Sequence, residues 1–327
     1  MKELRRRPLR LASVGLLGLA LLSGATALSA AASAAPKKTL GVVIYASTDP
    51  FSRDVGTGAS AVAKAAGWQV DTLDAMNDLP TMTSDIEALV SRKVTAIVVT
   101  TVPSTTIVGA LAQAKAANIP VISEDGGLAR GIAAAEANVN PQSSGALIRY
   151  MFGNMHGTGS LLALTYTPGA PCLQRDNQLF AGLKKYPKIH MTRYELPGTD
   201  VPQAGQTAAT AFLESHHAGS GNIAVWGCYD DPSIGALAAA KAMGRTDVQF
   251  YGYNGSPAAL QAIKTKTFTA TVYFDPIAVG HTVFSLVQKV LKAGRSWKPQ
   301  SVSGPYILVT QKNITSFLAA HPGALSS

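Results

Sequence analysis

Short runs of apolar, mostly β-branched residues alternate along the chain with Ala-rich stretches of helical period. Residues 39–47, 95–101 and 119–125 are apolar runs of strand length, and residues 54–67 and 104–118 have the spacing of amphipathic helices. A regular succession of strand, helix and strand is typical of a parallel sheet that is covered by helices on both faces. The first half of the chain is therefore expected to form an α/β domain.

The same alternation starts again after a changeover near residues 136–141. A strand at 159–166 and a helix at 175–186 begin the second series, which continues to a strand at 268–274. The sequence thus predicts an α/β fold with two similar doubly wound parallel-sheet domains. Ligands of such sheets bind at the carboxyl ends of the strands, so we expect a ligand cleft between the two domains.

The N-terminus has the three parts of an export signal. Basic residues precede an apolar segment at 11–22, and small residues with an Ala-x-Ala site at 32–34 follow it. The apolar segment is short for a membrane span. Ala25 occupies the place where a lipoprotein would carry its lipidated cysteine. We expect residues 1–34 to be a cleaved signal peptide, and the mature protein to be periplasmic and neither membrane-embedded nor lipidated.

The positive charge of the chain is concentrated in this leader. The whole sequence has 28 Lys and Arg against 19 Asp and Glu, a net charge of +9, and the leader accounts for four of these charges. The remaining basic residues are spread out and form no cluster of the kind that binds a phosphate backbone. Nucleic acid is therefore not an expected partner.

Several segments resemble one known family when they are taken in order. They are "YASTDPFS" (45–52), "IPVISEDGG" (119–127), the helix headed by Arg175, "DDPSIGALAAAKAMG" (230–244), "FYGYNGSPAAL" (250–260), "ATVYFDPIAVG" (270–280) and "ILVTQKNI" (307–314). In order and spacing these segments resemble the ribose-type, or type I, periplasmic binding proteins that serve sugar ABC importers. The resemblance covers residues 39–317.

The resemblance implies two lobes joined by a three-crossover hinge, with crossovers near residues 138–140, 273–276 and 303–306. It places residues 36–138 plus 275–304 in the N-terminal lobe and residues 139–274 plus 305–327 in the C-terminal lobe. It also implies an exported, monomeric solute-binding protein that closes over a small polar molecule and delivers it to a membrane permease. The alternative is a periplasmic sensor subunit that presents a nucleoside or aromatic ligand to a chemoreceptor or histidine kinase. No cofactor is expected in either case.

The resemblance also implies a set of ligand-binding residues: Asp49, Phe51, Asp125, Arg175, Tyr229, Asp230, Tyr253, Asn254 and Phe274. Phe51 would stack on the ligand, while Asp125 and Arg175 would hydrogen-bond its hydroxyls. Three assignments stay open at this level. Asp49 could instead cap the helix that begins near Arg53, Arg175 could form a surface ion pair with Asp176, and either Tyr229 or Asp230 could occupy the family's ligand-binding Asn position.

This chain departs from the family pattern at three ligand-binding positions. Asn254 replaces an Asp, Phe274 replaces a Gln, and Gly126 replaces an Arg. Strand-end aromatic residues, Trp226 and Tyr166 among them, add π surface near the site. These changes favour a less hydroxylated or a planar ligand.

The two cysteines are the other chemically distinctive residues. Cys172 and Cys228 follow the first and third strands of the second series. Such strands are usually neighbours, so the residues could form a disulfide, although two free thiols remain the alternative.

Catalysis and metal binding are not expected from this sequence. Asp230 and Asp231 are adjacent, so they would not flank one bond from two sides, and Asp231-Pro232 is a good helix start with Asp at the N-cap. His216-His217 ends a helix, where cations suit the helix dipole, so that metal binding is not expected there. The chain has no Ser/His/Asp or Cys/His set with local support.

Overall fold

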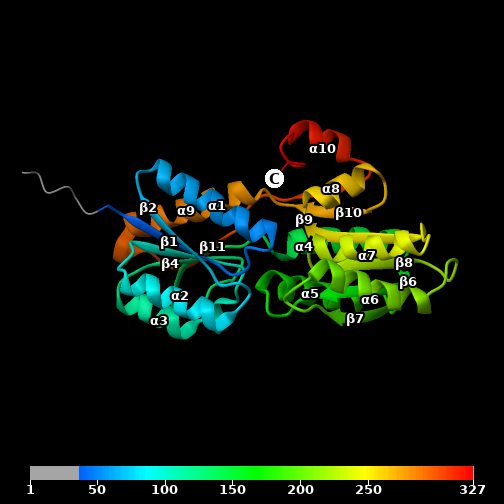
Figure 1. Ribbon diagram of the computed structural model, residues 1–327, viewed down its shortest axis with the longest axis horizontal. Coiled ribbons are helices and arrows are strands. Elements are labelled where there is room, and N and C mark those ends of the chain that lie inside the picture. The colour runs from blue at the N-terminus through cyan, green and yellow to red at the C-terminus, as the bar shows by residue number, and fades with distance from the viewer. Residues whose placement is uncertain (1–36, 327) are drawn as a thin grey trace, which may run out of the picture. The chain divides into compact units, whose positions relative to one another are not determined.

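The computed structural model describes residues 37–326, which contain two six-stranded sheets (Figure 1). The predicted signal peptide, residues 1–34, lies outside the described residues. The first sheet has the order β11-β5-β4-β3-β1-β2 and the second has the order β12-β10-β9-β8-β6-β7. The alternating strands and helices of both sheets confirm the predicted α/β fold.

All strands of the first sheet run parallel. They are β1 (Thr39–Ile44), β2 (Gln69–Asp74), β3 (Ala96–Thr100), β4 (Val121–Glu124), β5 (Ile132–Glu136) and β11 (Gln300–Val302). The helices of this lobe are α1 (Pro50–Ala65), α2 (Leu79–Ser91), α3 (Val108–Ala116) and α9 (Pro276–Ala293), with short 3₁₀ turns at Ser104–Thr106 and Gly294–Ser296. In Figure 1, α9, drawn in orange, lies beside the blue α1 although more than 200 residues separate them in the chain.

The second sheet is parallel except for β12, which pairs antiparallel to β10. Its strands are β6 (Thr158–Thr165), β7 (Lys188–Glu195), β8 (Ile223–Gly227), β9 (Val248–Asn254), β10 (Ala270–Tyr273) and β12 (Ile307–Thr310). Its helices are α4 (Pro141–Asn154), α5 (Ala170–Leu183), α6 (Val201–Ser215), α7 (Asp230–Ala242), α8 (Pro257–Lys264) and α10 (Ile314–Ala320).

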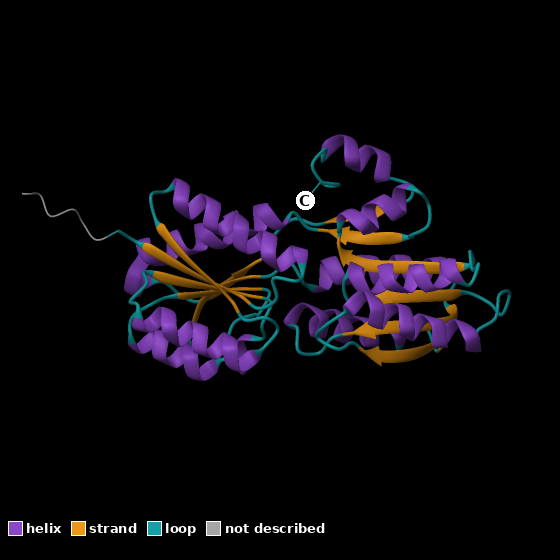
Figure 2. Ribbon diagram, in the orientation of Figure 1, coloured by secondary structure: helices purple, strands orange, loops and turns teal. Residues whose placement is uncertain are grey.

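Both faces of each sheet are buried under helices (Figure 2). Alternate residues of β1 show this, because Leu40 and Val42 pack in the cluster with Val55 of α1, whereas Val43 packs with Ile86 of α2. Side chains alternate between the faces of a strand, so a strand that is covered on both sides must be apolar throughout. This requirement explains the uninterrupted apolar runs in the sequence.

Several helices begin at a polar cap that is followed by proline. Asp49, Asp78 and Asp275 each accept a hydrogen bond from a backbone N–H of the first helical turn, and a Pro follows at the first or second helical position. Asn140 forms a capping box with Ser143 at the start of α4. Each cap fixes the residue at which its helix begins.

The chain passes between the two sheets at residues 137–140, 274–275 and 303–306. In the part of the chain that the structure describes, no helix combines the length and the hydropathy that crossing a membrane would require.

Candidate functional site

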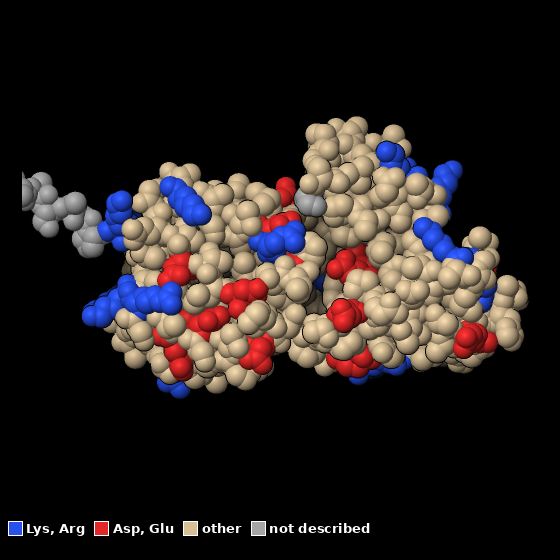
Figure 3. Space-filling view, in the orientation of Figure 1, with Lys and Arg blue, Asp and Glu red and all other residues tan. Residues whose placement is uncertain are grey.

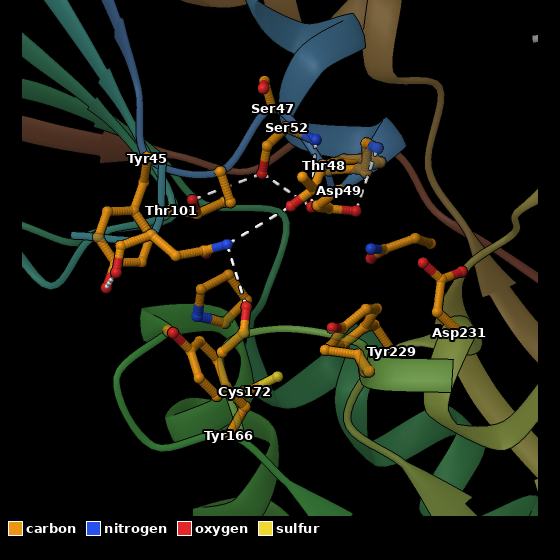
Figure 4. Close-up of a pocket in the computed structure, with 18 of the residues that line it drawn as sticks. Tyr45, Ser47, Thr48, Asp49, Ser52, Thr101, Tyr166, Cys172, Tyr229 and Asp231 are labelled. Atoms are coloured by element: carbon orange, nitrogen blue, oxygen red, sulfur yellow. Dashed lines mark hydrogen bonds between the residues drawn. The ribbon is translucent and has the colours of Figure 1, made fainter. Parts of the chain in front are cut away.

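A cavity of about 570 Å³ lies where the carboxyl ends of strands from both sheets meet (Figure 4). Its lining comes from the segments after β1, β2, β3 and β4 and from those after β6, β7, β8 and β9. The volume is in the usual range for small-molecule sites. The cleft expected at the strand ends is therefore present.

Strained backbone is concentrated at this cavity. Ten described residues other than glycine have a positive φ, and six of them line the cavity: Met76, Asn77, Thr101, Asp125, Asp200 and Asn254. A left-handed conformation is unfavourable for side chains with a Cβ atom and is worst for a β-branched residue such as Thr101. Strain of this kind gathers at ligand sites, where the surrounding fold holds it in place.

Asp49 caps α1 and also lies at the cavity, while its contact with a ligand stays a prediction. Its carboxylate caps α1 by accepting hydrogen bonds from the backbone N–H groups of Phe51 and Ser52, both at 3.2 Å, and from the Ser52 hydroxyl at 2.8 Å. It also lines the cavity. Burial raises the pKa of Asp49, and the hydrogen bonds from Ser52 partly oppose this rise.

Phe51 lines the cavity, and Phe274 supports it from behind. The two rings meet edge to face with their centroids 6.3 Å apart. Phe274 is 1 % exposed and is not part of the lining. The structure thus brings Phe51 to the cavity but not Phe274, so that direct contact of Phe274 with a ligand stays a prediction.

Arg175 is a buried residue in the first turns of α5, and it reaches the cavity from the C-terminal lobe. Its guanidinium group donates a hydrogen bond of 2.6 Å to the carbonyl oxygen of Cys228 and one of 3.1 Å to Oδ1 of Asn254. It also lies over the ring of Tyr253, 4.5 Å from the centroid. Burial lowers the pKa of Arg175, and the charge of Asp125 opposes this shift.

One donor of Arg175 has no partner among the described residues. Its Nε atom is buried and has no hydrogen-bond partner, and Arg175 forms no ion pair with the neighbouring Asp176 within the described residues. Asp176 instead lies 3.5 Å from Arg193. The guanidinium of this lining residue therefore keeps one buried N–H donor without a partner.

Asp125 lies at the end of β4 and lines the cavity from the N-terminal lobe. Its Oδ1 atom accepts a hydrogen bond of 3.0 Å from the backbone N–H of Val139 in the first crossover. Burial raises the pKa of Asp125, while the bond from Val139 and the charge of Arg175 lower it. Asp125 thus ties the cavity to the segment that connects the two sheets.

The segment after β8 places Tyr229 and Asp230 differently, and which of them contacts a ligand stays a prediction. Tyr229 lines the cavity, whereas Asp230 is fully buried beside it. The carboxylate of Asp230 accepts hydrogen bonds from the Ser256 backbone N–H at 2.7 Å and the Thr271 hydroxyl at 2.8 Å. Burial raises the pKa of Asp230 to about 7, and the two bonds limit the rise.

The predicted N-cap role of Asp231 is wrong. Helix α7 has Tyr229 at its N-cap and no side-chain cap bond, and Asp230 and Asp231 lie within its first turn. Asp231 instead lines the cavity. The helix begins two residues earlier than the Asp-Pro pair suggests, at Asp230, whose carboxylate is bonded to Ser256 at the start of α8.

Tyr253 and Asn254 occupy different positions at the end of β9. Asn254 lines the cavity and accepts the bond from Arg175. Tyr253 is fully buried, and its hydroxyl donates a hydrogen bond of 3.1 Å to the carbonyl oxygen of Ser144 in α4. Tyr253 therefore positions Arg175 rather than lining the cavity.

Cys172 and Cys228 form a disulfide with a Cα–Cα distance of 5.0 Å. Cys172 is in the first turn of α5, and Cys228 follows β8, which is paired with β6. The bond joins the segment that carries Arg175 to the loop whose carbonyl accepts its hydrogen bond.

Several lining residues were not among those inferred from the sequence. They are Tyr45, Asp74, Met76, Asn77, Thr101, Asp231 and the loop 198–202. Loops of the two lobes also touch there: the Asn77 side chain donates to the Gly198 carbonyl at 3.2 Å, and Gln174 donates to the Asp125 carbonyl at 3.1 Å. Tyr45 directly follows an apolar strand run, and this position at a strand end was the feature of the sequence that could have identified it as a lining residue.

Three buried carboxylates lie together at the end of β4, and one of them, Asp125, lines the cavity. Glu124, Asp125 and Glu136 have oxygen atoms within 4.8 Å of one another, a spacing that a metal ion could bridge. Burial, followed by the charge of Asp125, raises the pKa of Glu136 to about 9. A neutral Glu136 can share protons with its neighbours without a metal, so that the absence of a metal ion stays a prediction.

Comparison with known proteins assigns the fold and the family. The model of the family described as "Periplasmic binding protein domain" matches residues 40–296. The ribose import binding protein of Bacillus subtilis is 26% identical over 84% of this chain and 88% of its own length. The xylitol-binding protein of Mycolicibacterium smegmatis is 27% identical over 80% of this chain and 74% of its own length.

Solved structures share the fold. An ABC transporter solute binding protein from Agrobacterium vitis with bound allitol superposes with a TM-score of 0.81 and 23% identity, over 87% of this chain and 99% of that chain. One from Bacillus halodurans with bound myo-inositol gives a TM-score of 0.74 and 22% identity, over 86% of this chain and 98% of that chain. Because the family match covers most of the sequence, the chain belongs to the periplasmic binding protein domain family, whose members bind substrates and are not enzymes.

Proposed function

We propose that the protein is the exported solute-binding component of an ABC importer and that it captures a small sugar, polyol or related molecule. The observation that carries this proposal is the cavity of about 570 Å³ that elements of both sheets line. The import-protein names of the similar sequences and the sugar alcohols bound in similar structures support the same class of ligand.

Aromatic stacking and paired hydrogen bonds would hold the solute. Phe51, Tyr166 and Tyr229 offer ring faces for apolar C–H surfaces. Asp125 and Arg175 offer an acceptor and an unused donor to hydroxyl groups. Each buried hydroxyl needs a partner of this kind, since an unpaired one costs roughly 1–3 kcal/mol.

Binding would be coupled to closure of the two lobes, residues 36–138 plus 275–304 and residues 139–274 plus 305–327. Within residues 37–326, only the short segments 137–140, 274–275 and 303–306 connect the sheets. Short connections of this type can act as hinges when a ligand contacts both sides. The solute would complete contacts with Asp49 and Phe51 on one lobe and with Arg175 and Tyr229 on the other.

The proposed location and partner follow from the proposed role. Residues 1–34 would direct export to the periplasm, where the mature protein would act as a monomer. The closed, loaded form would then deliver the solute to a membrane permease without chemical change.

A binding screen tests this proposal. The mature chain is titrated by calorimetry with ribose, xylitol, allitol, myo-inositol and apiose, and each mixture is analysed for chemical change. We expect at least one solute to bind and to be recovered intact. Binding by none of them, or accumulation of a product, would contradict the proposal.

A pair of variants tests whether the solute binds in the cavity. Arg175→Met removes the buried donor and should lower affinity at least tenfold, because hydrogen bonds to charged groups contribute about 1.5–3 kcal/mol. Arg92→Met removes an exposed arginine that pairs with Asp71 away from the cavity, and it should leave affinity unchanged. Cooperative thermal unfolding of both variants checks that they fold.

A further inference from the structure

The cavity carries an excess of negative charge. Its lining includes five aspartates, namely Asp49, Asp74, Asp125, Asp200 and Asp231, and among the described lining residues Arg175 is the sole lysine or arginine. In the space-filling view, carboxylate side chains lie beside the hollow on the face that is shown (Figure 3). A neutral ligand would leave most of this charge without a counterion.

Arg175 does not compensate the whole set. Its guanidinium is fixed by Cys228 and Asn254 and by the ring of Tyr253, and its charge acts most strongly with Asp125. No ion pair joins Asp49 or Asp231 to a basic side chain in the described part of the chain. Asp74 and Asp200 likewise form no such ion pair, and Arg175 acts on Asp49 more weakly than on Asp125. Asp49 and Asp231 differ from the other three lining aspartates because they also line a second, adjoining cavity.

Asp49 and Asp231 approach the same space from different lobes. Figure 4 shows Asp49 beside the start of α1, with Tyr229 and Asp231 on the other lobe facing it. Both carboxylates, together with Tyr229, also line a small adjoining cavity of about 40 Å³. Burial, followed by the charge of Asp49, raises the pKa of Asp231 to about 6, which reflects their proximity.

Helix N-termini compensate these two carboxylates only in part. Asp49 caps α1, and Asp231 lies in the first turn of α7. A helix N-terminus supplies about half a positive charge, which is less than one carboxylate carries. Asp231 forms no side-chain hydrogen bond to another described residue, so that its acceptor oxygens are available to a ligand.

Aromatic rings surround the same space. Phe51 and Tyr229 line both the main and the adjoining cavity, and Tyr45 and Tyr166 line the main one. Ring faces attract cations as well as apolar surfaces. Two carboxylates among aromatic rings, with no basic side chain paired to either in the described residues, form an environment that suits an ammonium group.

We propose, on the basis of the function proposed above, that the solute carries a protonated amino group that binds between Asp49 and Asp231 against the ring of Tyr229. The ligand class is then an amino sugar, an amino polyol or an aminocyclitol. Its hydroxyl groups bind Asp125 and Arg175, and its ammonium group supplies the charge that the lining lacks.

Matched pairs of probes test this inference by calorimetry at pH 7.5. The pairs are glucosamine and glucose, glucamine and sorbitol, and an aminocyclitol and myo-inositol, with N-acetylglucosamine as the uncharged derivative. We expect an amine to bind at least tenfold more tightly than its neutral counterpart. Tighter or equal binding of the neutral members would overturn the amino-group inference while supporting the proposed function. If neither the amines nor their neutral counterparts bind, both the amino-group inference and the proposed function are contradicted.

Two variants test whether Asp231 and Asp49 cause the preference for an amine. Asp231→Asn keeps the shape of the side chain and removes its charge, and Asp49→Asn does the same while retaining a residue that caps helices well. Each should lower the amine-to-neutral affinity ratio at least tenfold. Glu214→Gln removes an exposed carboxylate on α6 and should leave the ratio unchanged. An unchanged ratio in both Asp variants would overturn the assignment of the amino group to this pair.

Discussion

At the scale of single residues, buried acids give the protein a stability that depends on pH. Glu124, Asp125 and Glu136 are all fully buried, and both carboxylate oxygens of Glu136 lack a hydrogen-bond partner. The folded state therefore holds a proton on Glu136 across a range of pH in which the unfolded chain releases it. The unfolded state then binds fewer protons, and stability must fall as the pH rises from about 4.5 to about 9.

The variant Glu136→Gln tests this linkage because the amide imitates the protonated acid. Between pH 5 and pH 8 the free energy of unfolding of the parent protein should decrease with pH, and the variant should lose a part of this slope of roughly 1 kcal/mol per pH unit. Denaturant unfolding at a series of pH values measures it. Equal slopes in parent and variant would show that Glu136 is ionised in the folded protein.

The sequence could indicate strand-end residues but not the direction of each side chain. Asp49, Phe51, Asp125 and Asn254 lie at or just after the carboxyl ends of strands and reach the cavity. Arg175 reaches it from α5. Tyr253 and Phe274 follow the same rule in sequence, yet packing turns them away. Their orientation depends on α4 and on Phe51, which are distant in the chain, so that no local pattern encodes it.

Among the helices and strands, α5 and the disulfide that holds its first turn position Arg175. The bond from Cys172 to Cys228 closes a segment with a sequence separation of 56, and α5 begins at Ala170 rather than at the expected residue 175. The earlier start places Cys172 and Arg175 on consecutive turns of one helix. The helical pattern at 175–186 lacks this first turn because Pro and Cys have weak helix signals of their own.

Removing the disulfide should destabilise the protein and loosen the site. For a closed loop of this length the loss is about 4 kcal/mol in the free energy of unfolding by the loop-entropy estimate. Denaturant unfolding of the double variant Cys172→Ser/Cys228→Ser against the oxidised parent measures it. A loss below about 1 kcal/mol would mean that the bond does little to restrict the unfolded chain.

Strand β5 shows where the sequence pattern fails for a whole element. Its five residues, Ile132–Glu136, include three alanines, which favour helices when considered alone. The strand exists because it pairs with β4 on one side and with β11 on the other. β11 is contributed from residues 300–302, so the decisive contact comes from a segment more than 160 residues away.

At the scale of the whole molecule, repetition of one α/β pattern was the strongest signal in the sequence. Two series of strands predict two sheets, and the parallel pairing within each sheet follows from the intervening helices. The antiparallel strand β12 is the exception, because it enters the second sheet directly from the third crossover with no helix between. The return of the chain to the first lobe, where it forms α9 and β11, could not be predicted from periodicity. Both elements look like a continuation of the second series.

We propose above that a small solute binds unchanged in the cavity between the two sets of strand ends. A crystal structure of the mature chain, grown with the tightest solute from the binding screens, tests it most directly. We expect an intact solute in contact with Phe51 and Asp125 on one side and with Arg175 and Tyr229 on the other. A solute bound elsewhere, or one chemically altered in the cavity, would contradict it.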